Sequence, residues 1–265
     1  MQGPAQGSAA PFGESQTAHL LERFYADGFL HLPGIFGADE VAALKAGIDE
    51  VFANPRWREN LAGDFIAVRL FEVAAIFEEV LAREPIIGLV ERVLGPDCHL
   101  IAENAVRNAP GQAIDAWHVD ETLYFPLGPG MERHDPRLKM PLFVCTVQCP
   151  LTDIPSAEYG PSEYVPSSHY SGRAPADPPV FEGRGPVPLL CRAGDVYLHN
   201  PQTWHRGLPN RSARTRYLFQ LHYGRRWVAQ RFHPFITYRM PPEILARADE
   251  RRRRVLGVHP KGPYG

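Results

Sequence analysis

The chain has 265 residues, of which 44% are hydrophobic and 22% charged, a balance typical of a globular protein that buries a sizeable core. Its 28 basic and 30 acidic residues give a formal net charge of −2. This balance gives no electrostatic reason to expect a nucleic acid or an anionic membrane surface as a partner. The length fits a single large β domain.

The cysteines and the N-terminus indicate the expected environment. Cys98, Cys145, Cys149 and Cys191 form no Cys-x-x-Cys pair, so neither a zinc ribbon nor a thioredoxin-like site is indicated, and buried free thiols are expected. No apolar stretch approaches the length of a membrane span, and the N-terminus lacks the basic start and apolar core of a signal peptide. We therefore expect a reduced, soluble protein of the cytoplasm.

The first third of the chain is predicted to be helical. Residues 1–15 are rich in Gly, Ala, Pro and Ser and are predicted to be a disordered tail. Hydrophobic residues at helical spacing then predict helices over 20–27, 39–52 and 73–94, the last of them interrupted at Pro85, and a short strand is expected over 29–32.

Beyond Gly95 the pattern changes to short apolar or alternating runs separated by Pro, Gly, Asn and Asp, which is typical of strands joined by turns. These runs occupy 98–107, 141–149, 163–166, 195–199 and 214–223. The Pro-rich segment 171–188 is predicted to be a loop and is a candidate lid. We predict one domain that is mainly β with flanking helices, with helical support at 16–95, a barrel or sandwich at 96–228 and a C-terminal helix at 241–256.

The sequence Trp117-His118-Val119-Asp120 contains a candidate metal site. In an extended segment, side chains two residues apart share a face, so His118 and Asp120 can converge on one ion. His205, which follows a strand-like run, is the candidate third ligand. Two imidazoles and one carboxylate form the facial triad of non-haem Fe(II) oxygenases, which leaves positions free for a cosubstrate and O2.

A His-x-Asp pair alone is weak, because roughly 0.5 such pairs are expected by chance with average composition. A second feature strengthens it. Arg216 lies eleven residues after His205 in a run where polar residues alternate with apolar and aromatic ones. Such a strand suits the wall of a barrel around a polar cavity, and a guanidinium there can bind both oxygens of a carboxylate. An exposed edge strand with solvated arginines is the alternative interpretation of this run.

Taken together, these motifs resemble those of the phytanoyl-CoA dioxygenase family of Fe(II)/2-oxoglutarate oxygenases. The resemblance begins with LERFYADGFLHLPGIFGADEVAALKAGIDEVF, continues through WHVD and YGPSEYVPSSH, and ends with GDVYLHNPQTWHRGLPNRSARTRY. Several spaced motifs in the family's order are more specific than any one of them. The resemblance implies a double-stranded β-helix, a jelly-roll or cupin-like barrel, flanked by helices.

The resemblance also implies roles for individual residues. His118, Asp120 and His205 match the iron ligands, and Arg216 matches the arginine that binds the cosubstrate. The family often has a hydroxyl residue shortly after the distal histidine, whereas Arg206 and Gly207 follow here. Asn104, Thr146 and Gln148 are candidates for the missing second contact to 2-oxoglutarate. Family halogenases have a small residue where Asp120 stands, so its carboxylate favours oxygenation over halogenation.

Three other features of the sequence have expected roles: a set of aromatic residues, one further histidine and a basic run. Trp117, Tyr124 and Phe125 are candidate substrate-binding residues, because ligand pockets are predominantly apolar and aromatic. His169 is expected to be structural and not a fourth ligand. The basic run at 251–254 is expected to be a solvated helix end, or one whose charges complement the helix dipole, since the net charge argues against a nucleic-acid patch.

The expected function is that of a 2-oxoglutarate-dependent dioxygenase with Fe(II) as cofactor and O2 as oxidant. Such an enzyme would hydroxylate or otherwise oxidise an unactivated C–H bond of a small molecule, and the composition is compatible with specialised metabolism. Two alternatives remain open: a non-oxidative jelly-roll enzyme with a divalent metal, such as an isomerase or hydrolase, and a barrel that binds a small ligand without turnover. The sequence indicates neither the substrate nor the oligomeric state.

Overall fold

Two antiparallel sheets face each other in the computed structural model of the protein, which describes residues 10–259. Within these residues, six strands are ordered β1-β8-β5-β10-β3-β2 and four are ordered β4-β9-β6-β7. The strands are β1 (Phe29–Leu32), β2 (Ile66–Val68), β3 (His99–Asn108), β4 (Ile114–His118), β5 (Val144–Pro150), β6 (Ser162–Tyr164), β7 (Val187–Pro188), β8 (Val196–His199), β9 (His205–Gly207) and β10 (Arg216–Gly224). The arrangement confirms the predicted mainly β, jelly-roll class.

The two faces of β10 differ as predicted: one packs into the hydrophobic core and the other lines a cavity. Tyr217, Phe219, Leu221 and Tyr223 belong to the main hydrophobic core. The alternating residues Arg216, Leu218, Gln220 and His222 line a cavity between the sheets. Because β10 pairs with β3 on one side and β5 on the other, this polar face lies in the middle of the larger sheet. The alternative of an exposed edge strand is therefore wrong.

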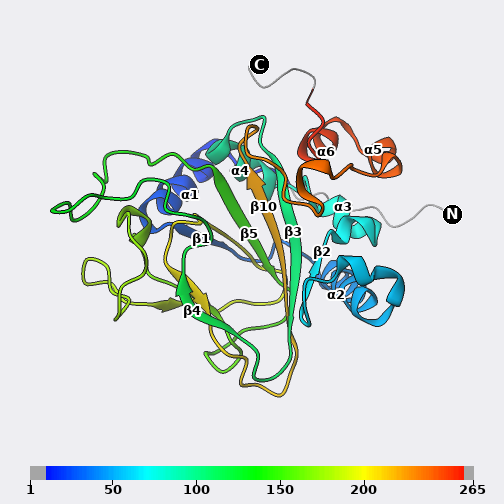
Figure 1. The fold of residues 1–265 in the computed structure, drawn as a ribbon, viewed down its shortest axis with the longest axis horizontal. Coiled ribbons are helices and arrows are strands. Elements are labelled where there is room, and N and C mark those ends of the chain that lie inside the picture. Colours follow the sequence, from blue (N-terminus) through cyan, green and yellow to red (C-terminus); the bar gives the residue numbers. More distant parts are fainter. Residues whose placement is uncertain (1–9, 260–265) are drawn as a thin grey trace.

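Helices cover the outer face of the larger sheet. They are α1 (Glu14–Asp27), α2 (Ala38–Ala53), α3 (Ala75–Val80) and α4 (Ile86–Leu94), with short 3-10 turns at Pro55–Asn60, Leu70–Glu72, Ser168–Tyr170 and Phe235–Thr237. The ring of Phe77 on α3 lies 5.4 Å from that of Phe219 on β10, centroid to centroid. Figure 1 shows α2 and α3 on the opposite side of β5, β10 and β3 from β4, so the cavity side of these strands is left to the smaller sheet.

The end of α1 shows how the sequence positions later elements. Gly28 caps the helix with a φ of +84°, and a Cβ there would lie 2.3 Å from the hydroxyl oxygen of Thr203. Glycine is required on both counts, because it alone tolerates this backbone and this close approach. The chain then turns directly into β1, which pairs with β8 as Phe29↔His199.

Two predicted boundaries shift. Most of the predicted tail, 1–15, lies outside the described residues, but Glu14 and Ser15 already belong to α1. The single helix expected at 241–256 is two helices, α5 (Pro242–Arg247) and α6 (Glu250–Val255). Ala248 is extended, and the Asp249 side chain accepts a hydrogen bond from the backbone N–H of Arg252, so Asp249 starts a new helix. The single-domain division remains a prediction.

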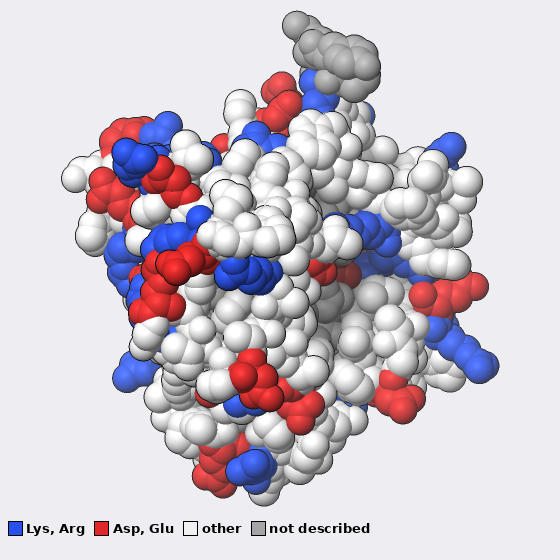
Figure 2. Space-filling model, turned by 60° about the vertical axis from the view of Figure 1, so that its left-hand side comes forward, with Lys and Arg blue, Asp and Glu red and all other residues white. Residues whose placement is uncertain are grey.

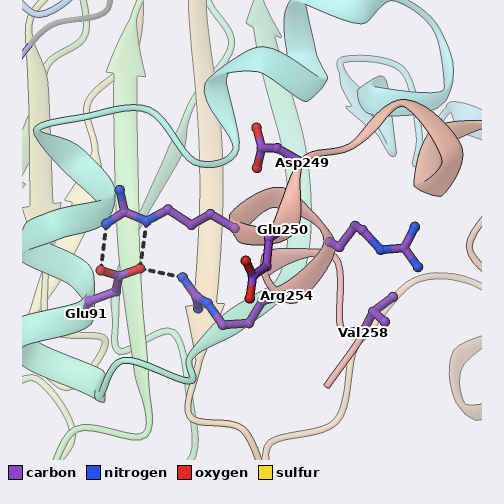
Figure 3. Close-up of a pocket in the computed structure, with 7 residues that line it drawn as sticks. Glu91, Asp249, Glu250, Arg254 and Val258 are labelled. Carbon is purple, nitrogen blue, oxygen red and sulfur yellow. Dashed lines mark hydrogen bonds and ion pairs between the residues drawn. The ribbon is translucent and has the colours of Figure 1, made fainter. Parts of the chain in front are cut away.

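The basic run at 251–254 fixes this C-terminal segment to the helical layer. Arg251 pairs with Glu91 of α4 and with Glu84, both at 2.6 Å, and Arg254 also pairs with Glu91 (Figure 3). Glu91, Arg251 and Arg254 line part of an open surface pocket. The run does form the basic last turn of α6, as expected of charges that complement the helix dipole, but Arg251 and Arg254 are held in ion pairs and are not simply solvated. Because Glu91 already pairs with both Arg251 and Arg254, this pocket is not the candidate functional site.

The rest of the surface and the interior agree with the composition. All four cysteines are buried and free. The face in Figure 2 carries acidic and basic residues interspersed, with a hollow right of its centre. Among the described residues, no helix combines the length and hydrophobicity that crossing a bilayer requires.

Candidate metal centre

Three candidate ligands lie together at the junction of β4 and β9. His118 and His205 are direct cross-strand partners in these two strands. Asp120 follows just beyond β4, where its backbone N–H donates to the carbonyl of Pro201 (3.0 Å). The ligand atoms of the three residues all lie within 4.8 Å of one another. The structure therefore brings together all three residues of the predicted triad.

Hydrogen bonds fix the two imidazoles in the form that binds metal. His118 donates from Nδ1 to the carbonyl of Ala116, and His205 donates from Nδ1 to that of Thr203, both at 2.8 Å. Each Nε2 therefore presents a lone pair, and these two atoms lie 3.7 and 3.3 Å from Oδ1 of Asp120. Two lone pairs facing a carboxylate oxygen repel one another unless a cation lies between them. This donor set fits a divalent metal ion.

The electrostatics agree with the geometry. Without a metal ion, a second proton on either imidazole can take the place of the cation next to Asp120. Burial alone would raise the pKa of Asp120, but in this metal-free state the charge of His205 and hydrogen bonds from His118, His199 and His205 hold it well below its ordinary value. The hydrogen bond to Asp120 in turn raises the pKa of His118. Asp120 is consequently an anion at any ordinary pH, as a ligand carboxylate has to be.

The triad opens on a cavity of about 230 Å³ between the sheets. The smaller sheet contributes the two histidines, and the larger sheet contributes the polar face of β10 and parts of β2, β3 and β5. Its lining residues are Ile66, Asn104, Val106, Ile114, His118, Asp120, Gln148, Ser162, His205, Arg206, Gly207, Arg216, Leu218, Gln220 and His222. The cavity is therefore apolar in part, with a few polar groups that converge on it, as in small-molecule sites.

Arg216 lines the same cavity as a buried cation. Its guanidinium donates to the carbonyl of Gly160 and, at 2.7 Å, to Oδ1 of Asn108. Its Nε and the Nδ2 of Asn108 are buried with no hydrogen-bond partner among the described residues. The ionisable groups of these residues that act on Arg216 are Tyr197 and Cys191, and neither is a carboxylate. Burial accordingly lowers the pKa of Arg216. With two unpaired donors, one of them on the guanidinium itself, this buried cation fits the carboxylate of a ligand.

The three candidates for a second cosubstrate contact differ in position. Asn104 and Gln148 line the cavity, whereas Thr146 is fully buried behind it. Thr146 donates to Nδ1 of His222 (3.2 Å), and His222 donates from Nε2 to Oδ1 of Asn104 (2.9 Å). Thr146 therefore orients His222 and is not among the residues that line the cavity.

The three candidate substrate residues lie outside this lining. Trp117 precedes His118 in β4, so it points to the opposite face of the sheet, where it packs against a cluster of Val165, Tyr170, Phe181 and Trp204. Tyr124 and Phe125 pack instead on Phe143, with ring centroids 4.7 and 5.8 Å away. Their contact with substrate remains a prediction. The candidate lid, 171–188, contributes no lining residue and packs by Phe181 against Trp204 on the outer face.

Two residues beside the site were missed. Asn108 could have been found from the pairing of β3 with β10, which places it directly opposite Arg216. His199 ends β8, and its Nε2 lies 2.9 Å from Oδ2 of Asp120. The block GDVYLHNPQTWH contains His199 as well as His205, but only the fold brings His199 beside the candidate metal ligands.

His169 is structural, as expected. Its Nε2 donates to the carbonyl of Tyr25 (3.0 Å), and its Nδ1 is buried without a hydrogen-bond partner among the described residues. The metal-ligand group does not include it. The ring therefore fixes α1 against the 3-10 turn Ser168–Tyr170.

Acid should destabilise the protein through this residue. Burial lowers the pKa of His169 to about 4, from 6.5. Between these values the unfolded chain binds a proton that the folded chain does not, so stability is full above pH 6.5 and falls as the pH decreases toward 4. The whole difference corresponds to about 3 kcal/mol. Urea unfolding of metal-free protein at pH 7.5 and 5 should show a smaller loss for His169→Gln than for wild type; equal losses would contradict this account.

A jelly roll with such a triad and an unpaired arginine on its inner wall has the architecture of the non-haem iron oxygenases. The sequence model of the phytanoyl-CoA dioxygenase family matches residues 24–218. The chain belongs to this family. Family membership confirms the predicted Fe(II), 2-oxoglutarate and O2 as its cofactor and cosubstrates, and an iron- and 2-oxoglutarate-dependent oxygenase as its general type.

Individual relatives are distant. The dioxygenase lolE1 of Epichloe uncinata is 25% identical over 219 residues, which cover 76% of this chain and 79% of the relative. The 2-oxoglutarate-dependent epimerase SnoN of nogalamycin biosynthesis superposes with a TM-score of 0.64 at 20% identity, over 83% of this chain and 86% of SnoN. HygX of Streptomyces hygroscopicus, solved with nickel and 2-oxoglutarate, gives 0.63 at 20% identity, over 80% and 88%. At such low identities the likeness to these two structures shows a shared fold.

Proposed function

We propose that the protein oxidises an unactivated C–H bond of a small molecule, with hydroxylation as the outcome, in specialised metabolism. One observation carries the proposal: a single cavity holds both the triad of His118, Asp120 and His205 and the unpaired, buried Arg216. A metal site alone would suit a hydrolase or an isomerase equally well. A metal site that shares its cavity with a carboxylate-binding cation suits a cosubstrate that has both a chelating end and a distal acid.

Formal charges support a dianionic cosubstrate. A divalent cation, the Asp120 carboxylate and the Arg216 guanidinium together carry two positive charges. The remaining charged lining residue, Arg206, is already paired with Glu163 at 2.8 Å. Since burying unbalanced charge is expensive, a dianion such as 2-oxoglutarate is the ligand that neutralises the cavity.

In the proposed mechanism His118, Asp120 and His205 hold Fe(II). Bound there, Fe(II) would supply the redox chemistry by which O2, as the oxidant, and 2-oxoglutarate, as the co-reductant, oxidise a C–H bond. Arg216 binds the distal carboxylate of the cosubstrate, and Asn108, which is buried behind it, holds the guanidinium by accepting its hydrogen bond, so little ordering is needed at binding. The hydrogen bonds of His118 and His205 to backbone carbonyls place the Nδ1 proton of each ring away from the ion, so that Nε2 is the nitrogen left to bind it. The apolar wall of Ile66, Val106 and Leu218 excludes water from the space beside the cosubstrate.

The primary substrate is proposed to be a small organic molecule. The support is the size of the cavity, about 230 Å³, together with the small-molecule pathway named for SnoN. SnoN is an epimerase, so hydroxylation is the part of the proposal that depends most on product analysis.

The experiment that tests the function is cosubstrate turnover. Purified protein with Fe(II), 2-oxoglutarate and O2 is expected to form succinate above an enzyme-free control, and a substrate panel should raise that rate and give products heavier by one oxygen atom. Omitting O2 or adding a chelator should stop succinate formation. Succinate at the enzyme-free level under all conditions would contradict the proposal, and a substrate transformation that survives without O2 would favour the non-oxidative alternative.

A further inference from the structure

A fully buried histidine contacts the candidate metal centre from the opposite sheet. His199 is the last residue of β8 and is 0% exposed. Its Nε2 lies 2.9 Å from Oδ2 of Asp120, whereas the other carboxylate oxygen, Oδ1, faces His118 and His205. The two oxygens of Asp120 are thus divided between the space enclosed by the triad and a hydrogen bond to the larger sheet.

The direction of this hydrogen bond follows from its neighbours. Asp120 is an anion and only accepts, so His199 carries its proton on Nε2. Its Nδ1 is then the acceptor, and the Tyr164 hydroxyl (3.1 Å) and the Gln148 amide (3.4 Å) are placed to donate to it. One tautomer therefore satisfies every contact.

The donors to His199 are themselves held in place. The Tyr197 hydroxyl donates to Oε1 of Gln148 (2.7 Å), which turns the amide N–H₂ toward His199. The Ser162 hydroxyl completes the chain to the oxygen of Tyr197 (2.8 Å). Every one of these side chains is buried. A buried chain with all members paired is rigid, because any rotation leaves a polar group unsatisfied.

We propose that His199 is a positioning residue that holds Asp120 as a one-oxygen ligand of the metal ion. The inference rests on the proposed function in that Asp120 is taken to bind the metal. The hydrogen bond keeps Oδ2 turned away from the two histidines, so one oxygen of the carboxylate is left for the ion. Without the donor, Oδ2 loses its partner and the carboxylate is free to rotate.

Three variants separate the hydrogen bond from the packing of the ring. His199→Phe keeps an aromatic ring beside His205 and Tyr164, whose centroids lie 4.8 and 5.3 Å away, but removes the donor. His199→Gln keeps an N–H in the place of Nε2. Tyr164→Phe leaves His199 in place and removes only one donor to Nδ1. The matched control is His99→Phe, which removes a buried imidazole that contacts the carbonyl of Val228, outside the cavity.

The full-length chain is stripped of metal with a chelator and titrated with Co(II) by calorimetry, and its visible ligand-field spectrum is recorded. His199→Phe is expected to weaken Co(II) binding about 10- to 100-fold, the usual effect of losing a partner of a metal ligand. Its spectrum should differ from that of wild type. His199→Gln should remain within about 3-fold of wild type, Tyr164→Phe should fall between the two, and His99→Phe should match wild type.

Each contrary outcome has one meaning. Wild-type affinity and spectrum in folded His199→Phe would overturn the proposal while leaving the metal site in place. Equal losses in His199→Phe and His199→Gln, with His99→Phe unaffected, would also overturn it, because ring packing and not the donor would then matter. If wild type and His118→Ala bind Co(II) alike, the proposed function fails before His199 is considered. If His199→Phe does not fold, Tyr164→Phe decides, and unchanged binding there would contradict the proposal.

Discussion

Replacing His118 or Asp120 with alanine is expected to lower 2-oxoglutarate-dependent succinate formation at least about 100-fold, equivalent to about 2.7 kcal/mol of transition-state stabilisation. Each supplies one of three ligand atoms that lie within 4.8 Å of one another. Removing one of them leaves the ion two donors, which is too few to hold it at low concentration. Succinate release at saturating 2-oxoglutarate and micromolar Fe(II) measures the effect.

The matched control for this loss is Asp115→Ala. Asp115 lies on β4, three residues before His118, and its side chain is exposed and not part of the cavity lining. Its removal takes one carboxylate from the same segment, as Asp120→Ala does, and should leave turnover within about 2-fold of wild type, as surface substitutions usually do. Retained activity in both His118→Ala and Asp120→Ala would refute the triad.

Replacing Arg216 with leucine is expected to raise the KM for 2-oxoglutarate at least about 100-fold. The variant removes a buried cation whose loss leaves one carboxylate of the cosubstrate unpaired in the cavity, and such pairs contribute several kcal/mol when one partner is removed. Arg216→Lys should restore only part of the affinity, because an ammonium lacks the planar fork of the guanidinium. Initial rates of succinate formation over a range of 2-oxoglutarate concentrations provide the measurement.

Asn108→Ala gives a smaller expected effect, about a 10-fold increase in the same KM, since it removes one hydrogen bond to a charged group. Fe(II) dependence should be unaltered in both Arg216→Leu and Asn108→Ala, which separates cosubstrate binding from metal binding. An unchanged KM in folded Arg216→Leu would exclude Arg216 as the carboxylate-binding residue.

Much of the fold and of the site could be predicted from local patterns. The alternation in β10 has a period of two, and this alone distinguishes the cavity face of Arg216 and His222 from the core face of Phe219. His118 and Asp120 lie two positions apart in a nearly extended chain, so their convergence is also a local property. His205 could be named as a candidate from its place after a strand-like run, and the family motif supported it. Its convergence with the pair depends on the pairing of β4 with β9, which joins segments 87 residues apart.

The residues that were missed depend on contacts between sheets. His199 meets Asp120 only because β8 and the end of β4 face each other across the cavity. Asn108 is identified by an unpaired buried nitrogen, a property that no sequence pattern displays. For Trp117 the rule that placed His118 and Asp120 on one face was available, and it already implies that the intervening and flanking residues point away.

The unpaired guanidinium also affects the stability of the folded state. A buried cation without an anion makes the empty barrel less stable than the filled one. On the proposed assignment, any ligand that supplies the missing acid shifts the folding equilibrium by mass action, by about 2.7 kcal/mol when its concentration is 100 times its Kd. The supply of a central metabolite would then govern the abundance of the protein as well as its turnover, and starvation for that metabolite would expose the chain to proteolysis.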